Sequence, residues 1–393
     1  MQLSIIILNY NVRYFLELCV LSVQNAIQDI DAEIIVVDNN SSDDSCEMMK
    51  QRFPDVNLIE NKQNLGFPKG NNIGVAQAKG EYICILNPDT VVAEDSFEKL
   101  LSFIKSAQNV GIVGCKLIDG AGNFLPESKR GVPTPFVAFT KILGLYKLFP
   151  KSRKLGKYYA NHLSENETGK VDILVGAFML MKKEFYLEVG GFDENCFMYS
   201  DDIDLSYMVL QKGRNNYYFH ETSVIHYKGE STVRDEVYMK RFQQAMEFFY
   251  KKHFKVSLFF NFFMKIGAFF FTLFKKSQAV TISRQPDKYL LFSEDEELKK
   301  TVENLLGNKV NLLDSTTKNT INSLTIDLKK NTEIIFDNNS LTFKSIIASM
   351  EEFRNPKCTF KILPKFSNFI IGSNNSNDRG KIIKIVKQEF YND

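Results

Sequence analysis

The segment NLGFPKGNNIGVAQAKGEYICILNPDT, from Asn64 to Thr90, predicts a loop, a helix, a strand and a second loop in direct succession. Glycine and proline interrupt its first part, where two asparagine side chains can cap a following helix; these residues are Gly66, Pro68, Gly70, Asn71 and Asn72. Gly80 is expected to end that helix. The succession is typical of one repeat of an α/β fold.

A buried strand and a carboxylate close this segment. Glu81 to Leu86, EYICIL, is short and apolar, as in a strand covered on both faces. Asp89 follows at the strand's carboxyl end, where open α/β sheets bind their ligands, and Pro88 stiffens the turn. NPDT is also an ordinary turn sequence, because Asn, Pro and Asp favour turns through local hydrogen bonds. The functional alternative is a carboxylate that holds a divalent cation against a diphosphate.

Strands and helices alternate from the N-terminus up to this segment. Apolar strands are expected at Ser4–Leu8, Glu33–Val37 and Val56–Glu60, which indicates βαβ units and a mostly parallel sheet with helices on both faces. Polar side chains follow the first two strands: Asn9, Tyr10, Asn11 and Asp38. Asp38 could accept hydrogen bonds from a nucleoside, or belong to a turn whose Ser41 or Ser42 caps the next helix. These loops and the Asp89 turn should converge on one crevice.

The second half of the pattern contains acidic residues, a histidine and two cations. Asp201, Asp202 and Asp204 begin a helix that Gly213 ends; one of them suffices as a cap, whereas two adjacent carboxylates in a closed site suit a general base. His226 follows an expected strand and is either structural or a second metal ligand. Lys129 and Arg130, in a loop over the crevice, could meet phosphates or be ordinary surface cations. We interpret residues 140–168 as a lid or acceptor loop.

Composition limits the class of protein. The 393 residues suggest two or three domains, and the formal net charge of +2 gives no overall field that would draw the molecule to nucleic acid. The six cysteines show no zinc spacing, and we interpret them as those of a reducing, cytoplasmic chain. The N-terminal MQLSIIILNY lacks the charged lead of an export signal and is better explained as a strand.

These motifs resemble those of the family 2 glycosyltransferases with the GT-A fold, in particular the branch that includes rhamnosyltransferases. The resemblance covers about Leu3 to Lys252. Its carriers, in the family's order, are SIIILNYN, VVDNNSSDDS, NLGFPKGNNIG, LNPDT, VGAFMLMKKEFYLEVGGFDE, FMYSDDIDL and VIHYKGEST. Each motif alone is weak, whereas the ordered set is specific. The resemblance implies an α/β fold with a Rossmann-like, mostly parallel sheet.

The resemblance also implies a role for each matching residue. A nucleotide-sugar donor would be bound by Asn9, Tyr10, Asn11, Asp38, Asn64, Gly66, Lys69, Asn71 and Asn87. Asp89 and His226 would hold a divalent metal, Mn²⁺ or Mg²⁺. Asp202 matches the catalytic base and Asp201 its acidic neighbour; because the branch commonly has Glu-Asp here, the base assignment between the two stays open. Such enzymes deprotonate an acceptor hydroxyl, which attacks the anomeric carbon with inversion.

Two other functions were weighed against a transferase. A sugar-phosphate nucleotidyltransferase would need a basic, Gly-rich loop after the first strand, which Asn9-Tyr10-Asn11 is not. A non-catalytic nucleotide-sugar-binding partner of another transferase is the remaining alternative. The processive synthases of the family carry Gln-x-x-Arg-Trp, and a chain without tryptophan cannot, so we expect transfer of a single sugar.

The C-terminal third divides into two parts, giving the predicted domains 1–247, 248–284 and 285–393. Phe248 to Lys276 is rich in phenylalanine and lysine and is either an amphipathic helix at a membrane surface or a helix buried between domains. A lipid-linked glycan acceptor at the cytoplasmic membrane face would favour the first. Beyond Gln285, strands and helices alternate again and predict a small α/β domain, whose GSNNSNDRG loop is either an anion site or an ordinary turn.

Overall fold

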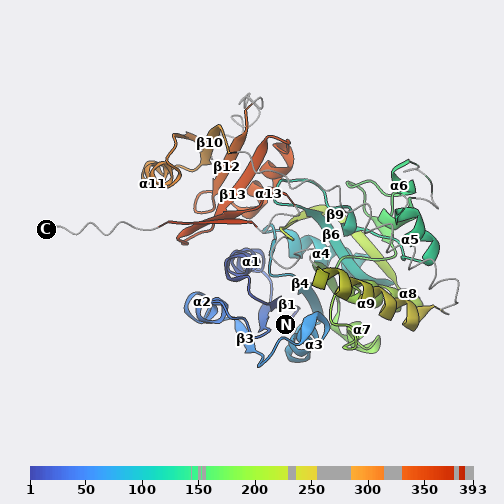
Figure 1. Cartoon of the computed structure of the whole chain (residues 1–393). Helices are drawn as coiled ribbons and strands as arrows, with labels where there is room; N and C mark the ends of the chain where they lie inside the picture. The colour runs from blue at the N-terminus through green and yellow to red at the C-terminus, as the bar shows by residue number, and fades with distance from the viewer. Residues whose placement is uncertain are drawn as a thin grey trace.

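The computed structural model describes residues 1–142, 144–148, 152, 156–228, 236–254, 285–313, 330–375 and 380–385. Two sheets organise these residues (Figure 1). The first sheet has the order β3 (Asn57–Glu60), β2 (Ala32–Asp38), β1 (Leu3–Asn9), β4 (Tyr82–Leu86), β8 (Phe178–Lys182), β6 (Val110–Ile118), β9 (Asn215–His226) and β5 (Thr90–Val91), and β7 (Gly169–Val171) pairs with β9. Strands β3, β2, β1 and β4 are parallel, whereas β8 is antiparallel to both of its neighbours.

Helices cover both faces of this sheet. The helices are α1 (Arg13–Ala26), α2 (Ser45–Arg52), α3 (Gly66–Gln77), α4 (Ser96–Ser106), α5 (Pro135–Ile142), α6 (Leu145–Leu148), α7 (Lys183–Glu188), α8 (Asp201–Gln211) and α9 (Glu236–His253), with short 3-10 turns η1 (Pro126–Ser128) and η2 (Lys157–Tyr159). One core cluster joins α1, α2 and α4 to one face, and another joins α3, α7 and α8 to the other. The predicted fold class, a mostly parallel α/β sheet with flanking helices, is confirmed.

The start and end of α3 differ from the prediction. The helix begins at Gly66, so Pro68, Gly70 and Asn71 lie inside it, and it ends at Gln77 rather than at Gly80. Proline is tolerated here because the first turn of a helix has no intrahelical acceptor for its N–H groups. The N–H of Phe67 instead donates to the carbonyl of Phe197, 2.9 Å away, which replaces the predicted asparagine cap.

Glycines in and after α3 permit close approach to β1. A Cβ atom at Gly70 would lie 2.3 Å from Leu8 Cδ1, and one at Gly74 would lie 2.5 Å from Ile6 Cγ2. At Gly80, a Cβ atom would meet the backbone nitrogen of Ser4 at 2.5 Å. The glycines therefore set the distance between α3 and the sheet, rather than breaking the helix.

The second sheet forms the small α/β domain that was predicted. Its order is β11 (Val310–Leu313), β10 (Lys288–Phe292), β12 (Thr332–Asp337), β13 (Cys358–Leu363), β14 (Phe369–Gly372) and β15 (Lys381–Lys384), with helices α11 (Glu296–Leu306) and α13 (Phe343–Glu352). Strands β11, β10, β12 and β13 are parallel, and β14 and β15 are antiparallel. The sequence did not indicate β11 or β15.

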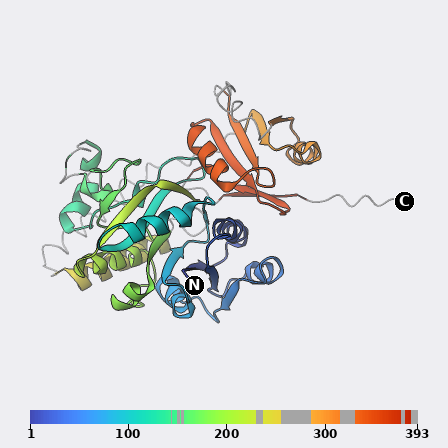
Figure 2. The ribbon, with the colours of Figure 1, turned by 180° about the vertical axis from the view of Figure 1, so that it is seen from behind.

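The two sheets share one apolar cluster. Phe15 of α1 and Tyr227, just after β9, pack with residues of β10, β12 and α13. Both ribbon views place the C-terminal domain against α1 (Figures 1 and 2). Across the same boundary, the Glu94 carboxylate accepts hydrogen bonds from the N–H groups of Phe343 and Lys344, at 2.7 and 2.8 Å, and so caps α13. The C-terminal domain is thus anchored to the domain that carries the predicted site.

Helix α9 runs across the predicted boundary at 247/248, and most of the phenylalanine-rich segment lies outside the described residues. Among the helices that the structure does describe, none combines the length and apolarity needed to cross a bilayer. The six cysteines are all free thiols.

Candidate active site

The carboxyl ends of β1 and β2 are joined by side-chain hydrogen bonds. Asn9 and Asp38 are paired in register, and Asn9 Nδ2 donates to Asp38 Oδ1 at 2.7 Å. Ser41 donates to the same carboxylate from its N–H at 2.8 Å and from its hydroxyl at 2.6 Å. Asp38 therefore lies in the local turn that was one of its two interpretations. The predicted helix cap at Ser41 or Ser42 is wrong, because α2 begins only at Ser45.

The other predicted donor-side residues of β1 lie in the adjoining loop. Tyr10 is 48% exposed, and Asn11 has a φ of 56° in the left-handed region, which asparagine tolerates better than most residues. The Asn11 side-chain oxygen accepts from the Ser42 N–H at 2.7 Å. Asn9 Oδ1, which is buried, has no hydrogen-bond partner. The end of β1 thus offers an exposed aromatic ring, that of Tyr10, and a buried acceptor without a partner, Asn9 Oδ1.

The start of α3 lies next to the same edge of the sheet. Asn64 Oδ1 accepts from the Gly66 N–H at 3.0 Å, and Asn39 Nδ2 donates to the Gly66 carbonyl at 3.0 Å. Asn71 is fully buried and its Oδ1 has no partner. Lys69 is half exposed and lies 3.9 Å from Glu194. The structure therefore places Asn64 and Gly66 beside Asn39, just after β2, buries Asn71 within α3, and leaves Lys69 at the surface.

Strand pairing brings Asp89 and His226 together. Strand β5 pairs with β9 so that Thr90 lies opposite His226, and the Tyr227 N–H donates to the Asp89 carbonyl at 3.0 Å. His226 Nε2 lies 3.4 Å from Asp89 Oδ1 and 3.4 Å from Asn87 Nδ2. Sequence reasoning named these residues separately, and the register of β9 explains their contact.

The Asp89 turn has the chemistry of a cation site. Asp89 and His226 are 3% and 5% exposed, yet neither Asp89 oxygen, nor Asn87 Oδ1, nor His226 Nδ1 has a hydrogen-bond partner. Buried carboxylate oxygens without a partner are costly unless a cation or donor occupies them. Burial raises the pKa of Asp89, but attraction to His226 and the nearby polar groups of His226 and the backbone together leave the pKa below its ordinary value. These oxygen and nitrogen atoms fit Mn²⁺ or Mg²⁺.

The two aspartates at the start of α8 have different partners. Asp202 Oδ2 lies 2.5 Å from Arg130 Nη2 and accepts from the Gly176 N–H at 3.1 Å. Asp201 Oδ1 is buried without a partner. A Cβ atom at Gly176 would lie 3.3 Å from Asp202 Cβ, so glycine lets the backbone come close to the acid pair. The structure holds Asp202 as one half of a buried ion pair.

Asp201 is the carboxyl group with the perturbed proton affinity. Burial, followed by repulsion from Asp202, raises the pKa of Asp201 to about 7. The raised proton affinity of Asp201 allows the two adjacent carboxyl groups to have different roles.

Asp201 is expected to make stability depend on pH. Because its folded pKa of about 7 exceeds the ordinary value of 3.8, the folded state binds more protons between these values, and the free energy of unfolding falls as pH rises. Urea unfolding with a chelator at about pH 5 and about pH 8 should show a larger fall for the unchanged chain than for Asp201→Asn. Equal falls would contradict the raised pKa.

The acid pair and the Asp89 turn meet through the start of β8. The Asn87 N–H donates to the Ala177 carbonyl at 3.0 Å, directly after Gly176, which bonds Asp202. The antiparallel pairing of β4 with β8 continues this contact along the sheet. The predicted metal ligands and the predicted base are therefore held by one stretch of backbone.

Arg130 is the site residue whose role sequence reasoning missed. It was considered only as a phosphate-binding or surface cation, whereas its side chain pairs with Asp202 and its backbone pairs with Ile173. Nothing in the sequence signalled a partner 72 residues away. Lys129 is not a phosphate ligand: it is buried and donates to the carbonyls of Tyr159, Ala160 and Leu163.

A pocket of about 430 Å³ adjoins Arg130 on the described part of the chain. Its lining residues are Arg130, Gly131, Ser152, Gly156, Lys157, Ala160, His162 and Asp172. Arg130 thus contacts the acid pair and also borders a space large enough for a sugar-sized ligand.

Comparison with known proteins identifies this arrangement. The family described as Glycosyl transferase family 2 matches residues 4–190, the range that holds the donor-side loops, the Asp89 turn and Gly176. Residues 4–190 therefore match a family 2 glycosyltransferase domain. The motifs predicted this family, and the relatives of the chain include rhamnosyltransferases.

Two relatives and one solved structure illustrate the similarity. N-acetylglucosaminyl-diphospho-decaprenol L-rhamnosyltransferase of Mycobacterium tuberculosis is 28% identical over 213 residues, which are 51% of this chain and 68% of that protein. Rhamnosyltransferase WbbL of Escherichia coli is 30% identical over 172 residues, 41% of this chain and 61% of that protein. The solved structure is that of mannosyltransferase PcManGT from Pyrobaculum calidifontis in complex with GDP-Man and Mn²⁺. Its superposition includes 71% of this chain and 76% of the PcManGT chain, with 16% sequence identity and a TM-score of 0.47.

Proposed function

We propose that the chain is an inverting glycosyltransferase that moves one sugar from a nucleotide-diphosphate donor to a lipid-linked glycan acceptor in cell-surface polysaccharide synthesis. The observation that carries this proposal is the contact, through the start of β8, between the Asp89–His226 couple and the Asp202–Arg130 ion pair. A diphosphate at the first and an acceptor hydroxyl at the second would put donor and acceptor side by side.

Asp202 acts as the general base in this proposal. Its pairing with Arg130 presents it as a carboxylate, and the Gly176 N–H orients one oxygen so that the other can accept the acceptor's proton. Asp201, with its raised pKa, supports the base as a neutral neighbour around pH 7. The deprotonated oxygen attacks the anomeric carbon from the face opposite the diphosphate, which inverts that centre.

Asp89, His226 and Asn87 would hold the divalent cation. A bound cation supplies positive charge that stabilises the departing diphosphate. Asn9, Tyr10, Asn11 and Asp38 would line the nucleoside part of the donor site, and Asn64, Gly66, Lys69 and Asn71 the wall beside the ribose and diphosphate.

The relatives support the donor and acceptor classes. Two are named as rhamnosyltransferases, and one acts on a diphospho-decaprenol, a lipid-linked acceptor. We therefore propose dTDP-rhamnose as the first donor to test, with UDP-hexoses next. We further propose three parts, with the first boundary moved from 247/248 to the end of α9 at His253, and a second part that meets the cytoplasmic face of the membrane.

A donor panel tests the proposal. The purified chain is expected to bind and slowly hydrolyse one member of a set of dTDP-, UDP- and GDP-sugars with Mn²⁺ or Mg²⁺, and to lose this activity with chelator. A lipid-diphosphate-linked glycan should then raise turnover of that donor. Binding without turnover, even with acceptor, would favour the non-catalytic partner instead, and absence of any donor binding would contradict both functions.

A further inference from the structure

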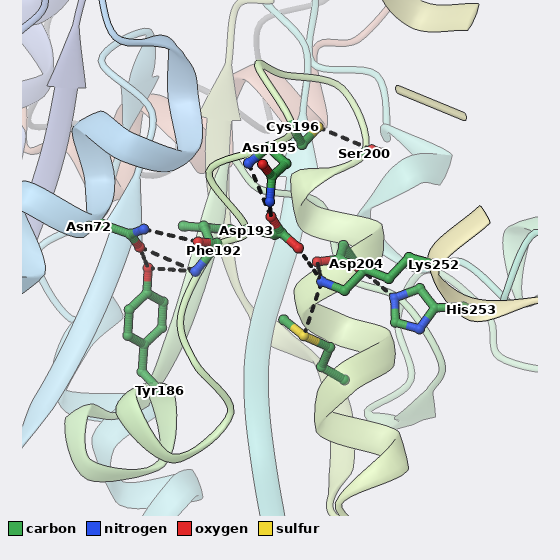
Figure 3. Close-up of polar contacts among 11 residues, drawn as sticks. Asn72, Tyr186, Phe192, Asp193, Asn195, Cys196, Ser200, Asp204, Lys252 and His253 are labelled. Carbon is green, nitrogen blue, oxygen red and sulfur yellow. Dashed lines mark hydrogen bonds and ion pairs between the residues drawn. The ribbon is translucent and has the colours of Figure 1, made fainter. Parts of the chain in front are cut away.

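Two side chains of α9, those of Lys252 and His253, contact α8 through a single buried carboxylate. Asp204, in the first turn of α8, is 1% exposed. His253 Nε2 lies 2.5 Å from its Oδ1, and Lys252 Nζ lies 2.8 Å from its Oδ2 (Figure 3). Lys252 also lies 2.7 Å from Asp193. Both oxygens of Asp204 are therefore held by the last turn of α9.

The same turn of α9 holds the segment that carries Arg130. The Tyr250 hydroxyl donates to the Pro133 carbonyl at 2.6 Å. A separate apolar cluster joins this segment to both helices; it consists of Val132, Ile173, Ile203, Met246, Phe249 and Tyr250. The end of α9 thus contacts the chain on each side of the Arg130–Asp202 ion pair.

We propose that Tyr250, Lys252 and His253 are positioning residues for the Arg130–Asp202 pair. They act through Pro133 and Asp204, not through contact with substrate. The inference rests on the proposed function, because it takes Asp202 as the base.

Geometry explains why this support matters. Asp204 lies two residues after Asp202 in the same helical turn, so a movement of Asp204 relative to α9 shifts or rotates Asp202 relative to Arg130. A misplacement of about 1 Å at a reacting group can lower the rate by roughly 100-fold. Loosening one of two supports should have a smaller effect, on the order of 10-fold.

Kinetics of the full chain test the proposal with paired variants. Tyr250→Phe and Lys252→Met are each expected to lower kcat about 10-fold while leaving the donor KM within about twofold. Lys252→Arg should restore most of the loss. The matched control is Lys251→Met, because Lys251 is 67% exposed and forms a surface ion pair with Glu247. It should leave kcat unchanged.

A second measurement needs no activity. Hydrogen exchange followed by mass spectrometry should show faster exchange in the 130–133 and 174–178 segments of Tyr250→Phe and Lys252→Met, with no change in α13. In an Arg130→Gln background, adding Tyr250→Phe should lower kcat no further, because the pair that it positions is already broken.

Two results would overturn the positioning role. Normal kcat with unchanged exchange in both segments would show that α9 does not support the pair. If Tyr250→Phe lowered kcat equally in the unchanged chain and in the Arg130→Gln variant, Tyr250 would not act through the Arg130–Asp202 pair. If the unchanged chain transferred no sugar, the proposed function would fail, while the exchange data would still decide whether α9 holds these segments.

Discussion

Asp202→Asn is expected to lower sugar transfer by about 10² to 10⁴-fold, the usual contribution of a general base. Asparagine has the same shape but cannot take the acceptor's proton. Donor affinity should change little, because Asp202 contacts Arg130 and the Gly176 N–H rather than the Asp89 turn. Transfer rates with saturating acceptor and donor binding by calorimetry provide the two measurements.

Comparing asparagine variants of Asp201 and Asp202 decides which of the two aspartates is the general base. Asp201→Asn should lose less transfer activity than Asp202→Asn; the reverse order would make Asp201 the base. Glu188→Gln is the control, since this carboxylate is 53% exposed and pairs with Lys212 at the surface. Asp202→Asn also leaves Arg130 buried without its counter-charge, so thermal unfolding must confirm that each variant is folded.

Asp89→Asn is expected to lower kcat/KM by about 100-fold or more and to abolish the dependence on Mn²⁺, because it removes the negative charge beside His226. Mn²⁺ binding, followed by electron paramagnetic resonance without acceptor, should weaken in parallel. In the absence of metal the free energy of unfolding at neutral pH should fall, because Asp89→Asn removes the attraction to His226 that lowers the pKa of Asp89 in the folded state.

A control variant at the amino end of β4, the strand that precedes Asp89, separates the loss of cation binding from the loss of a negative charge alone. Glu81 is 60% exposed and pairs with Lys182 at the amino end of β4. Glu81→Gln should retain Mn²⁺ binding and activity. If Asp89→Asn kept both as well, Asp89 would have no part in cation binding.

The sequence predicted the elements well where local pattern determines them. The apolar runs that became β1, β2 and β4 agree closely with the structure, because buried strands have a characteristic length and composition. Helix α3 was placed wrongly because a distant carbonyl, that of Phe197, satisfies its first turn. A single sequence carries no sign of that partner.

In the candidate site, too, the sequence predicted the residues that local motifs mark but not their tertiary partners. Asp89, His226, Asp201 and Asp202 were found from motifs at the ends of strands and helices. The partners that set their chemistry were not, because Arg130 meets Asp202, and Lys252 and His253 meet Asp204, only after the chain has folded. Sequence pattern locates reactive groups, whereas tertiary contacts fix their charge and direction.

The Glu94 cap of α13 has a consequence for how this chain can be handled. The first turn of a helix in one domain depends on a carboxylate from the other, and Phe15 and Tyr227 complete the C-terminal core. Cutting the chain between the sheets would leave open N–H groups on one fragment and a bare apolar face on the other. We therefore expect both sheets to melt in one cooperative transition, with equal calorimetric and van't Hoff enthalpies.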